Sequence, residues 1–184
     1  MFATIMTCRR PGGVNYLPET RDSLTRAGLR FCSVVTDGPT EHDPDGVRLG
    51  IVPTFRRAVM DCHRRNKSGP AIVFQDDIDA PPELGEIVHG LTCRFGVYSL
   101  FLSPNRMARP RWTEIPKSDE YPLNVGACGI VMDAATARQF LDSPPFPRVD
   151  RLGSQLVQWC WRESIPFFVH SPSLLRHTGE VSAK

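Results

Sequence analysis

Three aspartates follow a short apolar segment near the middle of the chain. The run Ala71-Ile-Val-Phe-Gln75 is followed by Asp76 and Asp77, and then by Asp79. The run is short and partly β-branched, which predicts a buried parallel strand rather than a helix. Ligands bind at the carboxyl ends of strands in open α/β sheets, and adjacent carboxylates repel each other unless a cation or hydrogen-bond donors hold them. The pattern therefore predicts a site for a hard divalent cation that carries a phosphorylated substrate.

Strand geometry would divide these side chains between two faces. If the extended backbone continues past the apolar run, Gln75, Asp77 and Asp79 point to one side. Asp76 then points to the other side, where it could reach a sugar hydroxyl or an amide while the first side holds a metal ion. The alternative is that these aspartates cap a helix expected near Glu83 and face water, because acidic residues often follow strands.

The first half of the chain alternates between strand-like and helix-like segments. Apolar spacing predicts strands over 2–7 and 31–36 and a third that begins at Ala71, and helices over 16–27, 54–66 (with Thr54 as its cap) and about 83–90. This βαβαβ alternation is typical of an α/β sandwich with a mainly parallel central sheet flanked by helices.

The second half is more mixed. We expect strands over 94–102 (with Phe95, Val97 and Ser99 on one side), 111–115, 126–132 and 167–170, and helices over 134–141 and 152–163, with Asp133 near the cap of the first. Prolines make residues 144–147 a stiff connector, and residues 172–184 read as a polar tail. The segment 103–122 reads as a long loop that holds the short strand.

Length and composition restrict the class of protein. A chain of 184 residues is expected to form a single domain with a real core. No apolar run approaches the roughly 20 residues of a membrane span, and the first residues pass straight into strand-like sequence, so we expect a cytoplasmic protein without a membrane partner. The six cysteines lack a C-x-x-C pair, which argues against a zinc site and favours small core residues in a reducing compartment.

Five segments, taken in order, resemble the nucleotide-sugar-dependent glycosyltransferases of the GT-A fold, in particular the compact, phage-type ones. The segments are Thr4–Pro11 with the following Tyr16–Leu24, Val35–Gly38, Phe74–Ile78, Asn124–Val131 and Ser171–Gly179. The resemblance implies one GT-A-like domain over 1–184, with a nucleotide-sugar and metal half at 1–90 and an acceptor half at 91–184. The chain departs from the family in its shortness and in Gln75, which stands where related Asp-x-Asp-like motifs often have an acid.

The resemblance implies a metal site of Mn²⁺ or Mg²⁺. Asp77 would be its main ligand, His177 a further ligand from the end of the chain, and Asp79 a reserve. Imidazole beside carboxylate suits manganese better than calcium, and the ion would neutralise the leaving diphosphate. The alternative for His177 is an ordinary surface or capping histidine.

The resemblance also implies a set of substrate-binding residues. Asp76 would bind the ribose or sugar of the donor, and Asp37 the base or ribose. Arg9 or Arg10 would pair with the phosphates through a forked guanidinium contact, although an arginine pair is often simply solvated. The remaining substrate-binding residues in the matched segments are Thr7 and Gly126.

An inverting transferase needs a carboxylate that takes the proton of the attacking hydroxyl. Asp150 stands between the proline-rich connector and the helix expected from Leu152, where several families place this base. Aspartate is also a favoured helix N-cap, so base and cap remain alternatives for Asp150. A retaining enzyme would need no such base.

The expected activity is transfer of a sugar from a nucleotide-diphospho-sugar, most simply a UDP-sugar, to an acceptor hydroxyl. The proline-rich loop carries Arg106, Arg109, Arg111 and Lys117 around Trp112. Basic side chains around an aromatic ring can bind nucleic acid, so a hydroxylated base of DNA is one expected acceptor, and a glycan or a protein is the alternative. The rival functions are a nucleotidyltransferase and a degenerate, non-catalytic module that binds nucleotide sugars. A nucleotidyltransferase would normally have a glycine-rich loop with a lysine after the first strand, and no lysine precedes Lys67.

Overall fold

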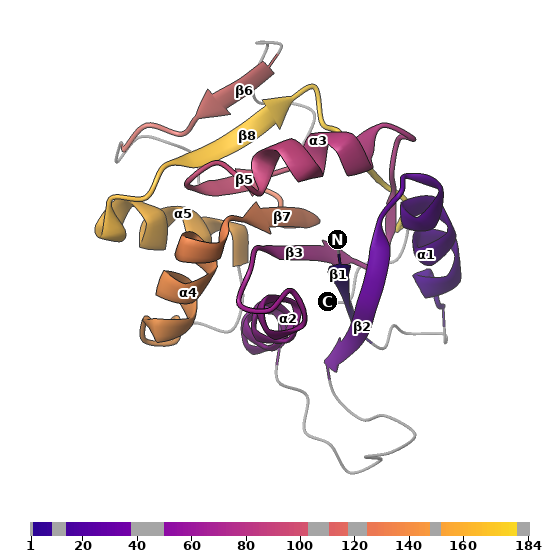
Figure 1. Cartoon of the computed structure of the whole chain (residues 1–184), viewed down its shortest axis with the longest axis horizontal. Coiled ribbons are helices and arrows are strands. Elements are labelled where there is room, and N and C mark those ends of the chain that lie inside the picture. The colour runs from indigo at the N-terminus through magenta and orange to yellow at the C-terminus, as the bar shows by residue number, and fades with distance from the viewer. Residues whose placement is uncertain are drawn as a thin grey trace.

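The computed structural model describes residues 2–8, 14–37, 50–102, 111–117, 125–147 and 152–179. These residues form an α/β domain in which helices flank a seven-stranded sheet (Figure 1). The sheet strands are β1 (Phe2–Cys8), β2 (Arg30–Asp37), β3 (Ala71–Gln75), β5 (Val97–Ser99), β6 (Arg111–Glu114), β7 (Gly129–Met132) and β8 (Phe167–Ser171). A separate pair joins β4 (Ile78–Asp79) to β9 (Arg176–His177). The helices are α1 (Leu17–Arg26), α2 (Ile51–Arg65), α3 (Leu84–Leu91), α4 (Ala134–Asp142) and α5 (Leu152–Glu163).

The sheet has the order β2-β1-β3-β7-β5-β8-β6. Strand β1 is parallel to β2 and to β3, and β5 is parallel to β8. Strand β7 is antiparallel to both β3 and β5, and β6 is antiparallel to β8. Five of the seven strands (β1, β2, β3, β5 and β8) therefore run the same way, and the predicted mainly parallel α/β sheet is confirmed.

The chain places α1 and α2 on opposite sides of the parallel strands. It moves outward from β1 to β2 and then returns across β1 to β3. Because such crossovers are right-handed, α1 and α2 must cover different faces, as Figure 1 shows. Helix α2 packs against β1, β2, β3 and also α4.

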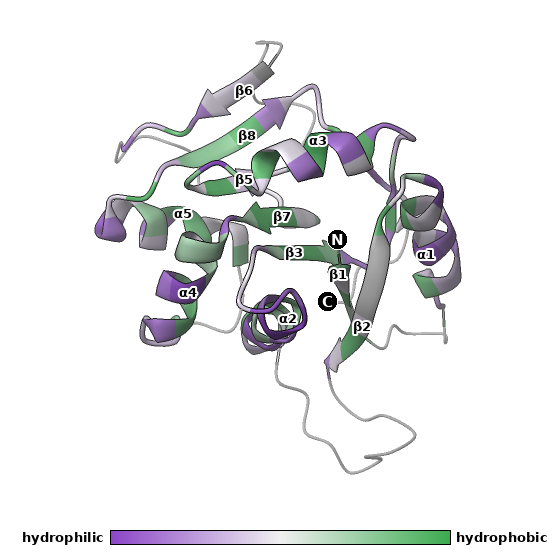
Figure 2. Ribbon diagram, in the orientation of Figure 1, coloured by the Kyte–Doolittle hydropathy of each residue, from purple (hydrophilic) through white to green (hydrophobic). Residues whose placement is uncertain are grey.

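The core lies where α2 meets the central strands. Phe55, Ala58 and Val59 form the buried face of α2, and residues 71–74 of β3 are buried on both sides. Figure 2 shows the same hydrophobic colouring along β3 and β7. Burial on both faces explains why the β3 sequence is apolar throughout rather than alternating.

The acidic run does not continue as one strand. Strand β3 ends at Gln75, which is the last residue of β3 that pairs with β1. The chain bends at Asp76 and Asp77 and becomes extended again only in the two-residue strand β4. The expected alternation of sides from Gln75 to Asp79 is therefore wrong, because the backbone turns between them.

Helix α2 begins earlier than predicted. Its N-cap is Gly50 rather than Thr54, with a φ of 84° that favours glycine. Pro53 is accommodated because proline is tolerated in a first helical turn. Thr54 lies inside the helix, where its hydroxyl donates to the carbonyl of Gly50 at 2.8 Å.

Two strands are also shorter in the structure than predicted from the sequence. The strand expected over 94–102 is limited to β5, and Phe95 is 52% exposed rather than on the buried side with Val97. The strand expected over 126–132 begins at Gly129. The predicted cap at Asp133 is confirmed, since its carboxylate accepts the backbone N–H groups of Ala135 and Thr136.

No helix in the described ranges has both the length and the apolar character needed to cross a membrane.

Candidate functional site

Helix α1 holds the bend that carries Asp76 and Asp77. The hydroxyl of Thr20 accepts the backbone N–H of Ile78 at 3.1 Å. It also lies 2.8 Å from the carbonyl oxygen of Asp76 and 3.0 Å from that of Ile78. Thr20 is completely buried, so its hydroxyl takes the place of a strand partner for backbone groups that would otherwise lack one.

Ser23 continues this contact one helical turn later. Its hydroxyl accepts the backbone N–H of Ala80 at 2.7 Å and lies 2.9 Å from the carboxylate of Asp79. Thr20 and Ser23 therefore fix both ends of the segment 76–80 against α1.

The first carboxylate of the bend contacts strand β1. The hydroxyl of Thr7 donates to Oδ2 of Asp76, which is 2% exposed. Thr7 follows Met6, the residue of β1 that pairs with Gln75 at the end of β3. Two predicted substrate-binding residues, Thr7 and Asp76, thus lie together at the carboxyl ends of two parallel strands, where α/β sheets bind ligands.

The second carboxylate contacts the end of the chain. Oδ2 of Asp77 lies 3.0 Å from Nε2 of His177. Strand β9 pairs His177 with Ile78, and the N–H of Thr178 donates to the carbonyl of Asp77 at 2.8 Å. The expected polar tail therefore includes a strand that brings the predicted late histidine to the bend.

Gly179 allows this close approach. A Cβ atom at this position would lie 2.6 Å from Oδ2 of Asp77, closer than real Cβ contacts. Any larger residue must therefore move either the carboxylate or the terminal segment.

Asp77 and His177 fit part of the coordination shell of an octahedral ion. Two neighbouring ligands at about 2.1 Å from Mg²⁺ are about 3.0 Å apart, the separation that these two atoms have. The described residues contain no group of three or more His, Cys, Asp or Glu side chains that could hold an ion. The pair could still serve an ion that takes its other ligands from substrate phosphates and water, as Mg²⁺ commonly does.

Asp79 is held elsewhere. Its carboxylate lies 3.0 Å from Nη2 of Arg176, its cross-strand partner, and within hydrogen-bond distance of Ser23. These contacts bind β4 to β9 and to α1. The structure thus groups Asp77 with His177 and turns Asp79 toward other partners.

The other predicted residues are spread along the same edge of the sheet or lie outside the described ranges. Asp37 is buried, pairs in register with Cys8, and accepts the N–H of Gly50 at 2.9 Å, which joins β2 to α2. Gly126 accepts a hydrogen bond from Ser99 at 2.9 Å, and a Cβ on it would meet the ring of Phe101. Arg9, Arg10 and Asp150 lie outside the described residues, as do Arg106 and Arg109.

Cys128 lies beside the bend, as a small buried residue of the kind expected for the cysteines. Burial, with a further contribution from the charge of Asp77, raises the pKa of its thiol to about 12. Its backbone carbonyl accepts the N–H of Gln75 at 2.9 Å.

The sequence reasoning missed Thr20, Ser23 and Gly179. The signal for the first two was present, since two hydroxyl residues three apart share the buried face of α1 with Leu24. Gly179 lies in the segment Ser171–Gly179, which resembles the glycosyltransferases, but the resemblance implied no function for this glycine. Its role depends on the fold of the terminal segment, which the sequence did not predict.

No protein-family model matches the chain, and neither does any curated protein. Solved structures do resemble it. A glycosyltransferase involved in the glycosylation of the major capsid of PBCV-1 has a TM-score of 0.53 at 14% identity, with 100% of this chain and 95% of that chain covered. A197 from STIV has a TM-score of 0.52 at 10% identity, with 99% and 97% covered.

A third similar structure is the 4-diphosphocytidyl-2C-methyl-D-erythritol synthase from Anaerococcus prevotii. Its TM-score is 0.51 at 15% identity, with 97% of this chain and 93% of that chain covered. These likenesses extend over nearly the whole of each chain, at identities that bear on the fold alone. The chain therefore has the α/β fold found in a glycosyltransferase and in a synthase of a diphosphocytidyl compound.

Proposed function

We propose that this protein is a metal-dependent glycosyltransferase that moves a sugar from a nucleotide-diphospho-sugar, most simply a UDP-sugar, to an acceptor hydroxyl. The observation that supports the proposal most is the pairing of Asp77 with His177 at 3.0 Å, directly after a parallel strand. A fold shared with a glycosyltransferase agrees with this reading. We propose Mn²⁺ or Mg²⁺ as the ion, held by Asp77 and His177.

In the proposed mechanism the two aspartates of the bend have different roles, one in binding the donor sugar and the other in binding the ion. Asp76, oriented by Thr7, hydrogen-bonds a hydroxyl of the donor ribose or sugar. Asp77 and His177 hold the ion, which would supply positive charge to the departing diphosphate. Arg9 or Arg10 would add forked contacts to the phosphates, while Asp37 and Gly126 complete the proposed substrate contacts.

The reaction exchanges one carbon–oxygen bond for another. The acceptor oxygen forms a bond to the anomeric carbon, the bond from that carbon to the phosphate oxygen breaks, and the nucleoside diphosphate leaves with the electron pair. We propose that Asp150 takes the acceptor proton if the configuration inverts. Rigid support of the bend by Thr20 and Ser23 would keep these groups in place during the reaction.

A binding and turnover experiment tests this proposal. UDP with Mn²⁺ at about 100 times its dissociation constant should stabilise the protein by about 2.7 kcal/mol. Asp77→Asn should remove the manganese-dependent part of this gain and the hydrolysis of a UDP-sugar. No stabilisation by any of a panel of nucleotide sugars with Mn²⁺ would contradict the proposal, and release of pyrophosphate from a nucleoside triphosphate would instead identify a nucleotidyltransferase.

We propose a hydroxylated base of DNA as one acceptor, with a glycan or a protein as the alternative. The support is the basic, tryptophan-bearing segment around Trp112, which lies on the edge strand β6. Contacts to DNA phosphates would make duplex binding weaken strongly between about 50 and 200 mM salt. Binding that is weak and insensitive to salt would exclude DNA and leave the other acceptors.

A further inference from the structure

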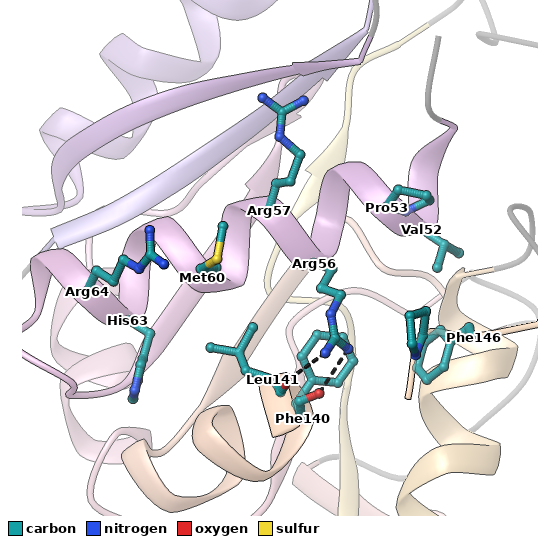
Figure 3. Close-up of a pocket in the computed structure, with 11 residues that line it drawn as sticks. Val52, Pro53, Arg56, Arg57, Met60, His63, Arg64, Phe140, Leu141 and Phe146 are labelled. Atoms are coloured by element: carbon teal, nitrogen blue, oxygen red, sulfur yellow. Dashed lines mark hydrogen bonds between the residues drawn. The ribbon is translucent and has the colours of Figure 1, made fainter. Parts of the chain in front are cut away.

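A groove of about 650 Å³ lies between α2 and the end of α4, among residues that the proposed site does not use (Figure 3). Its apolar surface includes Pro53 and Met60 of α2 and Leu141 and Phe146 of the α4 side. All four residues are partly exposed to solvent. The volume is within the usual range of ligand pockets.

Arg56 of α2 holds the end of α4, which forms one wall of the groove. Nη1 of Arg56 donates to the carbonyl of Phe140 at 3.1 Å, and Nη2 donates to the carbonyls of Leu141 and Ser143, the latter at 2.9 Å. The guanidinium also lies 5.5 Å from the centre of the Phe140 ring. Arg56 therefore caps the carboxyl end of α4, where a cation is favoured, and three of its five N–H donors are directed at this helix end.

The aromatic packing behind this wall supports the same conclusion. Phe140 makes edge-to-face contacts with Phe55, Phe146 and Trp159 at centroid distances of 5.7, 5.7 and 5.3 Å. The indole N–H of Trp159 donates to the hydroxyl of Ser143 at 3.0 Å. A surface held in place in this way loses little conformational entropy when it binds a partner.

The rim of the groove is positively charged. Arg57 and Arg64 are both exposed and stand seven residues apart on α2, so they lie on the same side of the helix two turns apart. Among the residues that the structure describes, none that lines the groove is acidic. Within the described ranges neither guanidinium forms an ion pair. The one aspartate of α2, Asp61, contacts Arg65 and Ser33.

We propose that this groove docks an acidic amphipathic segment of a partner protein. The lining residues of α2 run from Val52 to Arg64, a length of about 18 Å at the helical rise of about 1.5 Å per residue. That length accommodates about three turns of a helix. The apolar side chains of the helix would fill the groove, and its carboxylates would pair with Arg57 and Arg64. The positive charge of Arg57 and Arg64 favours an acidic segment over a basic one. A groove also fits a cylindrical helix better than a flat bilayer. The proposal is independent of the proposed glycosyltransferase activity.

Selection from a phage-displayed library of random 16-residue peptides tests the proposal. The full chain is the target, and the double variant Arg57→Glu, Arg64→Glu is the counter-target. We expect enriched peptides with acidic residues flanking apolar residues at helical spacing. A fluorescent copy of the strongest peptide should bind at least about tenfold more weakly to the double variant, and more weakly as salt increases.

Two controls make the result decisive. The double variant Arg26→Glu, Arg162→Glu makes the same change in net charge on α1 and α5 and should bind the peptide like the wild type. Met60→Gln, which retains both arginines, should also weaken binding, and circular dichroism should show that every variant is folded. Enriched peptides that are basic, or that bind all variants equally, would overturn the proposal. So would binding to vesicles of phosphatidylcholine with phosphatidylglycerol when no acidic peptide is enriched, since that result would identify a membrane surface.

Discussion

Nε2 of His177 lies 3.0 Å from Oδ2 of Asp77, across the short antiparallel pair formed by β4 and β9. The carboxylate is almost buried, with 8% of its side chain exposed, whereas 39% of the histidine side chain is exposed. One member of the pair is thus fixed in the protein and the other is open to solvent. This arrangement is suited to an ion that is shared with a substrate arriving from solution.

Removing the histidine should weaken metal binding without unfolding the protein. For His177→Ala we expect Mn²⁺ affinity, measured by electron paramagnetic resonance in the presence of UDP, to fall by about 10- to 100-fold. His89→Ala, on the exposed side of α3, is the matched control and should have no effect. Equal affinities in both variants would show that His177 is not a ligand.

Gly179→Ala should disturb Asp77 through its added methyl group. The new Cβ would lie 2.6 Å from the carboxylate, so we expect a loss of about 1–3 kcal/mol in the free energy of unfolding together with weaker Mn²⁺ binding. Gly90→Ala is the control, since a Cβ there meets nothing within 4 Å. Because Gly90 lies within α3, its replacement should be neutral or stabilising by up to about 1 kcal/mol. Urea unfolding of both variants measures these changes. Equal losses of unfolding free energy in the two variants would contradict the role of Gly179.

Thr20 should matter through its hydroxyl rather than through its methyl group. Thr20→Val keeps the shape but leaves the buried N–H of Ile78 without its partner, so the free energy of unfolding should fall by about 1–3 kcal/mol. Because the bend carries Asp76 and Asp77, Thr20→Val should also bind UDP with Mn²⁺ more weakly. Thr20→Ser keeps the hydroxyl and should retain most of this affinity. If valine and serine variants bind the ligand equally well, Thr20 does not position the bend.

Asp79 and Asp77 should behave differently. The ion pair between Asp79 and Arg176 is largely exposed, and such pairs contribute about 0–1 kcal/mol. We therefore expect Asp79→Asn to cause a small loss of stability and little change in Mn²⁺ affinity. A loss of affinity as large as that of Asp77→Asn, measured by the same titration, would show that Asp79 is a ligand after all.

The cysteines should differ in reactivity. Because burial raises the pKa of the Cys128 thiol to about 12, its thiolate is scarce in the folded protein at about pH 8, and alkylation requires the thiolate. Mass spectrometry after brief treatment with iodoacetamide should therefore find exposed Cys93 modified before Cys128. Rapid labelling of Cys128 in the native protein would contradict the buried placement.

The same pKa shift predicts how stability depends on pH. The unfolded chain begins to release the Cys128 proton near the ordinary thiol pKa of 9.0, whereas the folded protein retains it until about pH 12. Its contribution to stability is therefore complete below about pH 9 and is lost as the pH rises toward 12. Cys128→Ala should reduce the loss of unfolding free energy between these limits, as measured by urea titration.

The sequence by itself determined the strand that precedes the site and the class of fold. Residues 71–74 are apolar without alternation, which requires burial on both faces, and this is how β3 lies in the sheet. The cap at Asp133 and the bounds of α5 were also predictable, since capping and helical periodicity are local properties. The resemblance to GT-A glycosyltransferases implied that Asp77 and His177 hold one ion, and the structure brings these two side chains together.

Only the tertiary structure decided how the acidic run is divided. Period-two alternation would have grouped Asp77 with Asp79, but pairing with β1 ends at Gln75 and the hydroxyls of α1 take over the backbone. The chain then bends, so Asp77 meets His177 while Asp79 meets Arg176. These contacts depend on residues far apart in the chain, and a local pattern contains no information about them.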